Sequence, residues 1–484
     1  MLLVAALLLL LLHWNPLPMS WLTGELSVLV VYIVLGSMAL KRAQPAGAGA
    51  QLSGIPYVLW IRGIGSLDTR TERVSDSVGN GSRPSSFGVA LMPEASTRTK
   101  TPTVPRVGEA LWNLGFRPFY LLAGIFAAVS VALWICQYSG YLPPTYAEGA
   151  AQHGSEMLFG YTLAVVTGFL FTAVRNWTNR PTPTGRTLAA LAMLWLAGRL
   201  LVFTPFSVAA ASANAAFALA VAIGIAVPLL RSGNRRNYFF VALLGFLGTV
   251  ALAVHLRGRV WETSLSLQIG LDVILFLLVV MGGRVIPMFT NNGVPGTRAQ
   301  RHRPLEWFAL ASVLLLLAAD AVQVSPRVIV VLSLVAAVAH AGRLFLWQTW
   351  RTLSTPLVWI LHVSYAWIVV HLLLRACVAD GLLAAPIAIH ALTIGAIGGM
   401  TLGMMTRTSK GHTGRVLFAD RYDFACFCLV QLAALVRVFG GMSLPGRYRD
   451  TVVASGLLWC AAFALFAARY WHVLSKPRLD GKPG

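Results

Sequence analysis

The chain of 484 residues is 57% hydrophobic and only 11% charged, and its mean hydropathy is +0.70. These values exclude an ordinary soluble globular protein, in which charged residues make up about a quarter of the chain. The net charge of +21 does not indicate nucleic-acid binding, because the basic residues are spread over many connections and form no single basic domain. We therefore expect an all-α polytopic membrane protein.

Residues 1–105 form an N-terminal extension that differs from the rest of the chain. Residues 21–40 are apolar enough for one additional helix, whereas residues 43–105 are rich in Gly, Ser, Thr and Arg without apolar periodicity, which is typical of a disordered linker. Met92 lies shortly before the next apolar segment. The extension is therefore either a genuine helix with a linker, or a gene-model artefact in a protein whose translation begins near Met92.

From residue 106 the sequence contains twelve apolar segments, each close to the roughly 20 residues that a helix needs to cross a bilayer. They are residues 117–138, 156–174, 187–204, 207–230, 237–256, 264–289, 305–322, 327–346, 356–376, 383–406, 422–440 and 451–472. The short connections leave no room for a separate soluble domain. We expect a bundle of about twelve transmembrane helices over residues 106–476, followed by a tail at residues 477–484.

Arginine and lysine residues are distributed unevenly between the two sets of connections. Sixteen follow spans 2, 4, 6, 8 and 10, namely Arg175, Arg180, Arg186, Arg231, Arg235, Arg236, Arg284, Arg298, Arg301, Arg303, Arg343, Arg351, Arg407, Lys410, Arg415 and Arg421. Six occur in the alternate connections, namely Arg257, Arg259, Arg327, Arg375, Arg447 and Arg449. Because positive residues favour the cytoplasmic side, we expect both ends of the twelve-helix body to lie in the cytoplasm.

Ionisable side chains within the predicted spans are few, and the predicted topology sorts them by depth. The outer half holds His153, Glu156, Arg199, His255, Asp272, His371, His390 and Arg437, while His340 and His362 lie deeper. Such groups are costly in a membrane and usually face the interior of the bundle. Imidazole can bind haem iron or copper, and buried arginines suit haem propionates. The set is consistent with a haem or metal site, or with the proton or substrate relay of a transporter.

The stretch at residues 390–414 combines an ionisable ring with a pattern for close helix packing. Gly395, Gly399 and Gly403 follow the small-xxx-small pattern, which lets a second helix approach closely. On an α-helix, His390 projects to the side opposite this glycine ridge. We expect the ridge to pack against another helix and His390 to face a further helix or a cofactor.

Helical spacing excludes several direct pairs. Asp272 and Arg284 are separated by roughly 18 Å along one helix and cannot pair. His362 and His371 face opposite sides, so one metal ion cannot bind both. His362 and Tyr365 lie one turn apart, which indicates an ordinary hydrogen-bonding role for His362.

The five cysteines are Cys136, Cys377, Cys426, Cys428 and Cys460. They form no CxxC pair and no CxxCH motif for covalent haem attachment. We expect all five to be packing residues, and any haem to be bound non-covalently as a b-type haem.

Several segments together carry a family resemblance. They are "LWNLGFRPFYLLAGIF" (111–126), "EMLFGYTLAVVTGFLFTAVRNWTNRP" (156–181), "WLAGR" (195–199), "GGRVIPMFTNN" (282–292), "WILHVSY" (359–365) and "HALTIGAIGGMTLGMMTRTSKGHTGR" (390–415). In this order, across the whole twelve-span body, they resemble the NnrS family of haem- and copper-containing bacterial membrane proteins of nitric oxide metabolism. The first hundred residues have no counterpart in this resemblance.

The resemblance implies a haem site and a copper site made from the buried histidines. The candidate cofactor ligands are His153, His255, His362 and His390, of which His153, His255 and His390 are also candidate metal ligands. Arg199 and Arg437 are the candidate propionate partners. One departure concerns copper: where the family pattern reads like WHAHEM, this chain reads QHGSEM, with Ser155 in place of the second histidine.

The resemblance implies a haem-binding integral protein of the bacterial cytoplasmic (inner) membrane, with copper as a further expected cofactor, in the response to nitric oxide and nitrosative stress. Its partners would be the lipid bilayer and nitric oxide or a related small molecule, and any enzymatic activity would be that of an oxidoreductase. Two alternatives are open: a secondary transporter for a metal, haem or small solute, and a terminal oxidoreductase of the haem-copper type. The sequence gives no internal repeat of the kind that transporters often show.

Overall fold

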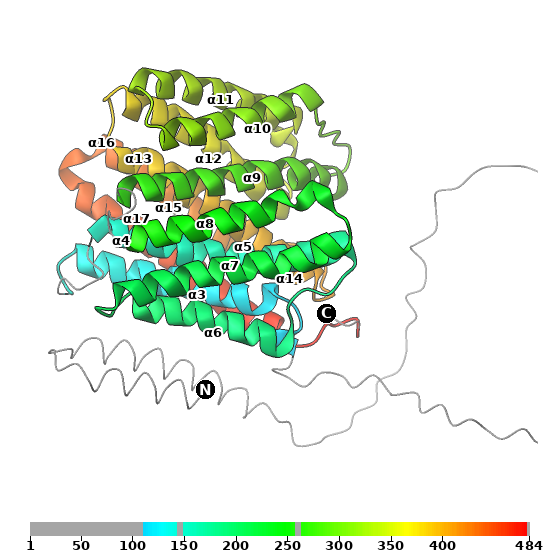
Figure 1. Cartoon of the computed structure of the whole chain (residues 1–484). Helices are drawn as coiled ribbons and strands as arrows, with labels where there is room; N and C mark the ends of the chain where they lie inside the picture. Colours follow the sequence, from blue (N-terminus) through cyan, green and yellow to red (C-terminus); the bar gives the residue numbers. More distant parts are fainter. Residues whose placement is uncertain (1–109, 143–148, 257–262, 482–484) are drawn as a thin grey trace, which may run out of the picture. The chain divides into compact units, whose positions relative to one another are not determined.

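The structure is a computed structural model that describes residues 110–142, 149–256 and 263–481 (Figure 1). Within these ranges the chain forms helices and no strand, which confirms the all-α prediction. The predicted helix at residues 21–40 and the linker at residues 43–105 lie outside the described residues.

Twelve helical segments run through the described ranges, and each corresponds to one predicted span. The first six are α3 (Phe116–Tyr138), the continuous unit of α4 (Gly149–Ser155), η2 (Glu156–Thr162) and α5 (Leu163–Thr178), then α6 (Gly185–Leu201), α7 (Ser207–Arg231), α8 (Phe239–His255) and α9 (Thr263–Gly293). The last six are α10 (Arg303–Ala321), α11 (Pro326–Leu346), α12 (Pro356–Ala379), the unit of α13 (Ala385–His390), η5 (Ala391–Gly398) and α14 (Gly399–Gly411), the unit of α15 (Arg421–Leu435), η6 (Val436–Gly440) and α16 (Gly441–Ser443), and α17 (Tyr448–Ser475). Short 3₁₀ turns at the connections are η1 (Ala110–Trp112), η3 (Arg235–Asn237), η4 (Thr349–Arg351) and η7 (Pro445–Arg447).

By length and composition, eleven of these segments can cross a membrane. The exception, α6, has 17 residues, whereas α8, which also has 17, is continuous with η3 and forms a segment of 21 residues at Arg235–His255. The predicted all-α fold of about twelve membrane helices is therefore confirmed.

Local residue choice explains where several helices begin. Four helices carry a proline in their first turn, where its fixed φ suits a helix and its missing N–H is not needed. These residues are Pro304, Pro326, Pro356 and Pro386. Helix α15 begins with a capping box, in which the Asp420 side chain accepts from the Asp423 N–H and the Asp423 side chain accepts from the Asp420 N–H.

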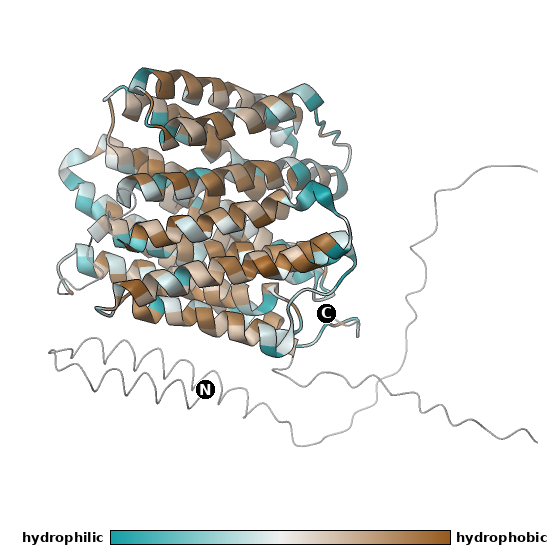
Figure 2. Ribbon diagram, in the orientation of Figure 1, coloured by the Kyte–Doolittle hydropathy of each residue, from teal (hydrophilic) through white to brown (hydrophobic). Residues whose placement is uncertain are grey.

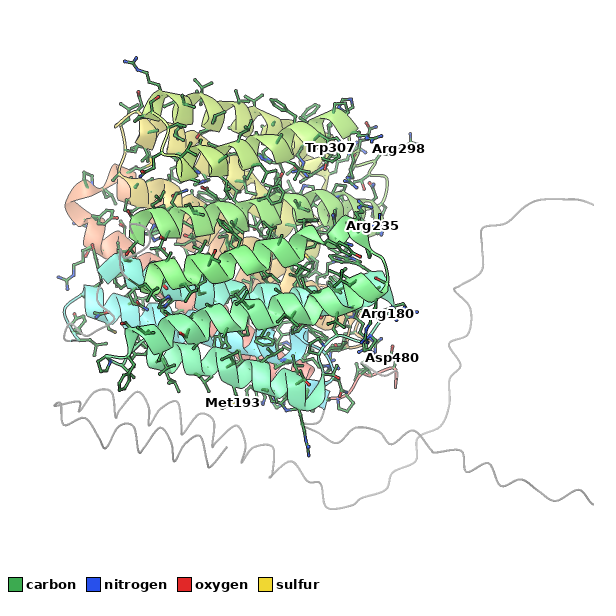
Figure 3. All side chains as sticks on the ribbon, in the orientation of Figure 1. Arg180, Met193, Arg235, Arg298, Trp307 and Asp480 are labelled. Atoms are coloured by element: carbon green, nitrogen blue, oxygen red, sulfur yellow. The ribbon has the colours of Figure 1, made fainter. Side chains whose placement is uncertain are left out.

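Charge and hydropathy distinguish the ends of the bundle from its middle. Figure 2 shows hydrophilic residues gathered at the helix ends and hydrophobic residues along the helices. Arg180, Arg235, Arg298 and Asp480 lie at the same end (Figure 3). We call this the basic end, and the other the opposite end.

Hydrogen bonds join neighbouring connections at the basic end. Nδ2 of Asn234, after α7, donates to the carbonyl oxygen of Trp177, near the end of α5, over 3.4 Å. The backbone N–H of Arg298, after α9, donates to Oε1 of Gln348, after α11, over 2.9 Å. Alternate connections therefore share one end, and consecutive segments run in opposite directions.

The first and last segments of the body are joined. Helix α3 packs along α17, and Nη1 of the fully buried Arg117 donates to the carbonyl oxygens of Leu474 (2.9 Å) and Lys476 (2.7 Å). This arginine completes the C-terminal turn of α17, whose last carbonyl groups have no partner within the helix.

The predicted glycine ridge packs against α12. A Cβ atom at Gly395 would lie 2.3 Å from Cγ of Trp367, and one at Gly399 would lie 2.2 Å from Oγ of Ser364. Gly403 meets the same helix. Only glycine allows α12 to approach this closely, so the packing role of the ridge is confirmed.

Three π-helical segments within the described ranges were not predicted. Glu156 opens η2, His390 directly precedes η5, and Arg437 lies in η6. A π-helical turn contains more residues than an α-helical turn and is often found at functional sites. The α-helical projection that set His390 opposite the glycine ridge therefore does not hold through η5.

Candidate cofactor site

Three predicted site residues from distant parts of the chain come together toward the opposite end of the bundle. His153 lies on α4, His390 ends α13 and Arg437 lies in η6. Segment α13 packs against η6, and α4 packs against α3. The positive charge of Arg437 acts electrostatically on both imidazoles, and His153 acts on His390. We call this group the His153–His390–Arg437 cluster.

The ring of His153 is held by an aromatic neighbour. Trp134 on α3 stacks on it, with 4.8 Å between the ring centroids and 12° between the ring planes. Nδ1 of His153 is buried and has no hydrogen-bond partner among the described residues. Because an unsatisfied buried polar atom is costly, a ligand that bonds to Nδ1 of His153 would remove this cost.

A hydrogen bond to the backbone orients His390. Its Nδ1 lies 2.6 Å from the carbonyl oxygen of Pro386, one turn earlier. Since a carbonyl oxygen can only accept, Nδ1 carries the proton and Nε2 keeps its lone pair. Histidines that bind metals are commonly fixed by a hydrogen bond of this kind.

Arg437 is anchored on one side only. Its Nη2 donates to the hydroxyl of Tyr448 over 2.7 Å, and its guanidinium lies 4.9 Å from the centre of the Tyr448 ring. Its Nη1 is buried without a hydrogen-bond partner in the part of the chain that the structure describes. A guanidinium nitrogen of this kind is suited to a carboxylate.

The cluster fits the haem that the sequence predicts. Imidazole nitrogen is a common ligand of haem iron, and guanidinium groups pair well with propionates. The cluster offers two imidazoles and one guanidinium with an unused donor. Across residues 110–142, 149–256 and 263–481, no group of three or more His, Cys, Asp and Glu side chains is placed to hold a metal ion.

Arg199 and His255 lie in a different hydrogen-bonded chain. Nη1 of Arg199 is 2.8 Å from Oε2 of Glu156, and its Nη2 donates to Oδ1 of Asn214. Nδ2 of Asn214 lies 3.3 Å from Nε2 of His255, whose Nδ1 donates to the carbonyl oxygen of Ala251 over 2.8 Å. The structure thus gives Arg199 a carboxylate partner within the protein and engages both ring nitrogens of His255.

His362 is also engaged through both ring nitrogens. Its Nε2 lies 2.7 Å from Oγ1 of Thr290, and its Nδ1 lies 3.0 Å from Oγ1 of Thr349. The hydroxyl of Tyr365 bonds to Nδ1 of His340 over 2.7 Å. These contacts agree with the hydrogen-bonding role that the sequence indicated for His362.

Asp272 and Asp320 share the cation Arg375 toward the opposite end, and the sequence did not predict this arrangement. Nη1 of Arg375 lies 2.9 Å from Oδ1 of Asp272, and its Nη2 contacts Oδ2 of Asp320. The sequence places Arg375 in a connection because it lies near the end of its span. An acid within an apolar span requires a cation at its own depth. Because Arg375 on α12 lies at the same depth as Asp272, their common depth could have indicated the pair.

His412 lies at the basic end, away from the cluster. Its ring packs against Phe116, with 5.7 Å between the centroids. Burial lowers the pKa of His412, and the positive charges of Arg478 and Arg117 lower it further. These contacts support a structural role for this ring.

Comparison with known proteins adds the family. Residues 110–478 match the family model described as NnrS protein, and residues 1–64 match a model described as invasion gene expression up-regulator, SirB. No protein of curated function matches the chain. The first match covers all twelve helical segments that the structure describes and most of the chain. The chain therefore belongs to the NnrS family of membrane proteins.

Proposed function

We propose that the protein binds a b-type haem non-covalently and acts in the response to nitric oxide and nitrosative stress. The observation that carries this proposal is the His153–His390–Arg437 cluster, in which Nδ1 of His153 and Nη1 of Arg437 are buried without partners among the described residues. The family membership and the resemblance set out above support the same function.

Each residue of the cluster has a distinct task in this proposal. Nε2 of His390 or a ring nitrogen of His153 would hold the iron and leave it able to bind a small ligand, and Nη1 of Arg437 would donate to a propionate. The hydrogen bond to Pro386 and the stacking of Trp134 hold the two imidazoles in place before any ligand binds. When bound, haem would supply an iron centre for a small ligand such as nitric oxide.

The position of the cluster between helices does not prevent access by nitric oxide. The gas is small, neutral and soluble in lipid, so it can reach an intramembrane site without a hydrophilic channel. This property distinguishes it from ionic substrates, which would require a polar path through the apolar middle of the bundle.

Copper is the further cofactor that the resemblance implies. His153, His255 and His390 are its proposed ligands, but Nε2 of His255 already contacts Asn214. Ser155, which stands where the family pattern has a histidine, is buried, and a neutral hydroxyl is a poorer copper ligand than imidazole. We therefore give haem precedence over copper.

Optical spectroscopy of the purified protein tests the proposal. A Soret band that shifts on addition of nitric oxide is expected, and acidified organic solvent should extract all of the haem. His153→Ala and His390→Ala should lower haem content or shift the band, whereas His472→Ala, at an exposed histidine of α17, should leave both unchanged. A protein that lacks a Soret band after expression with adequate haem would contradict the proposal.

The orientation in the membrane is a further part of the proposal. The basic residues at the basic end favour a cytoplasmic location for that end of a bacterial inner-membrane protein. A cysteine introduced at the exposed Arg235 should be protected from an impermeant reagent in intact cells, and one at the exposed Arg447 should be labelled. The reverse pattern would place the basic end outside.

A secondary transporter is the second candidate, and one observation favours it. Arg375 bridges the carboxylates of Asp272 and Asp320, and the neighbouring His371 has a buried Nε2 without a hydrogen-bond partner in the described ranges. Buried acids and histidines of this kind can relay protons. Proton uptake coupled to solute movement in liposomes, in a protein without a Soret band, would favour the transporter.

A further inference from the structure

A polar pocket lies at the basic end, outside the cofactor site. It has a volume of about 400 Å³ and is lined by Trp177, Asn234, Arg236, Asn237, Arg284 and Arg301. The lining comes from α5, the connection around η3, the last third of α9 and the connection before α10. We call it the arginine pocket.

The positive charge of the arginine pocket is poorly compensated. Three guanidinium groups line it, and no carboxylate is among its lining residues. Glu306 lies 3.6 Å from Nη2 of Arg301, but its two carboxylate oxygens also lie 3.1 and 3.0 Å from the buried Arg343. Because Arg343 already neutralises Glu306, the pocket keeps an excess of positive charge.

One wall of the arginine pocket is held in place before any ligand binds. Nη1 of Arg284 donates to Oδ1 of Asn237 over 2.7 Å, and its guanidinium lies 5.6 and 5.7 Å from the ring centres of Phe239 and Phe240. Asn237 is buried and donates to Oδ1 of Asn234 over 3.0 Å. The Arg284 guanidinium therefore loses little conformational freedom when the pocket binds an anion.

The height of the pocket along the helices suits a lipid headgroup. Trp307, close to the pocket in sequence, is 65% exposed and lies near the basic end (Figure 3). Exposed tryptophans are enriched where a membrane meets water, and basic pockets between membrane helices bind phosphate-bearing headgroups.

We propose that the arginine pocket binds a phosphate group, which an anionic phospholipid headgroup or a free phosphate anion can supply. Guanidinium groups donate paired hydrogen bonds to phosphate oxygens, and three of them line this pocket. The site is separate from the cofactor cluster, so it does not depend on haem binding.

Thermal unfolding of the delipidated full chain in neutral detergent tests the proposal. The ligands to add are phosphatidylglycerol, phosphatidylcholine and inorganic phosphate at constant ionic strength. The pocket variant is Arg236→Gln with Arg301→Gln, and the matched control is Arg231→Gln with Arg298→Gln. All four arginines are exposed, and the control pair lies at the basic end outside the pocket lining. Both variants lose the same charge.

The expected result is that phosphatidylglycerol binds the wild type at least roughly tenfold more tightly than phosphatidylcholine does. The pocket variant should lose this preference, and the control should keep it to within about twofold. Stabilisation by inorganic phosphate alone, lost only in the pocket variant, would identify a free phosphate as the ligand. Absence of binding to the wild type, or equal losses in the two variants, would overturn the proposal.

Discussion

Two buried arginines show how differently the same side chain is used in this bundle. Arg343 on α11 bonds through Nε and Nη2 to Glu306 (3.1 and 3.0 Å) and through Nη1 to the hydroxyl of Tyr365. Arg437 bonds through Nη2 to Tyr448, while its Nη1 is buried without a partner in the described ranges. One guanidinium is satisfied within the protein, and the other retains capacity for a ligand.

The histidines divide in the same way. His362 is bonded through both ring nitrogens to Thr290 and Thr349. His153 has a buried Nδ1 without a partner among the described residues, and His390 keeps a lone pair on Nε2. A buried histidine or arginine is therefore not by itself a sign of a cofactor. The informative property is the bonding capacity that the protein leaves unused.

Replacing each arginine by methionine tests whether the two side chains contribute differently to stability. Arg343→Met should lower the free energy of unfolding by about 3–5 kcal/mol, because Glu306 would lose its close cation, and the exposed Arg301 at 3.6 Å compensates only in part. Arg437→Met removes one hydrogen bond to Tyr448 and should cost about 1 kcal/mol. Thermal unfolding in detergent measures both. Equal losses would show that the two sites are used alike.

The glycine ridge separates packing from cofactor binding. Gly399→Leu should lower the free energy of unfolding by about 1–3 kcal/mol or more, because a Cβ there already clashes with Ser364 and Gln431. The yield of folded protein should fall, and the haem spectrum of the remainder should be unchanged. Gly411→Leu is the control, since its Cβ would make only an ordinary contact with Leu417. A changed spectrum in Gly399→Leu would place the ridge at the cofactor.

A conservative change at His362 tests whether this histidine, unlike His390, is dispensable for haem binding. His362→Gln keeps a donor and an acceptor beside Thr290 and Thr349, so the loss should be about 0.6 kcal/mol, with an unaltered haem spectrum. His390→Gln should lose haem, although the free energy of unfolding of the haem-free protein should fall by about as much as in His362→Gln. Loss of the Soret band in His362→Gln would move the ligand assignment to the deeper histidine.

The smallest effect is expected in the pH dependence of stability. Burial, together with Arg478 and Arg117, lowers the pKa of His412 in the folded protein. In the unfolded chain the ring binds a proton near pH 6.5, so its contribution to stability is complete above that pH and is lost as the pH falls toward the folded pKa. His412→Gln should flatten this slope in thermal unfolding between pH 5 and 6.5. An unchanged slope would assign it to other groups.

The sequence predicted the helical segments well because the apolar length of a span is a local property. It also predicted the glycine ridge, since spacing along one helix is sufficient for that. The buried pair of Asp272 with Arg375 spans 103 residues of chain, and no local pattern encodes such a contact. Depth follows from topology, but lateral neighbours depend on how twelve helices are arranged around one another.

The same limit applies to the cofactor cluster. His153, His390 and Arg437 were expected at one depth, and their proximity required the packing of three separate segments. Arg199 and His255 were expected at that depth too, yet Glu156 and Asn214 engage them. Which polar groups a protein satisfies internally depends on side-chain contacts far apart in sequence, and these were not available from periodicity.

The π-helical segment η5 sets the rotational phase between His390 and the glycine ridge on the same helical unit. A π turn is equivalent to one residue inserted into an α-helix. Because the wider turn absorbs this residue, the phase between His390 and Gly399 differs by about 100° from that of a regular α-helix of the same sequence. If η5 straightened into an α-helix without losing a residue, the ridge would stay against α12 and the imidazole would turn away from Arg437. Every site residue and the full apolar length of the span would be unchanged, and only the phase between the ridge and His390 would differ.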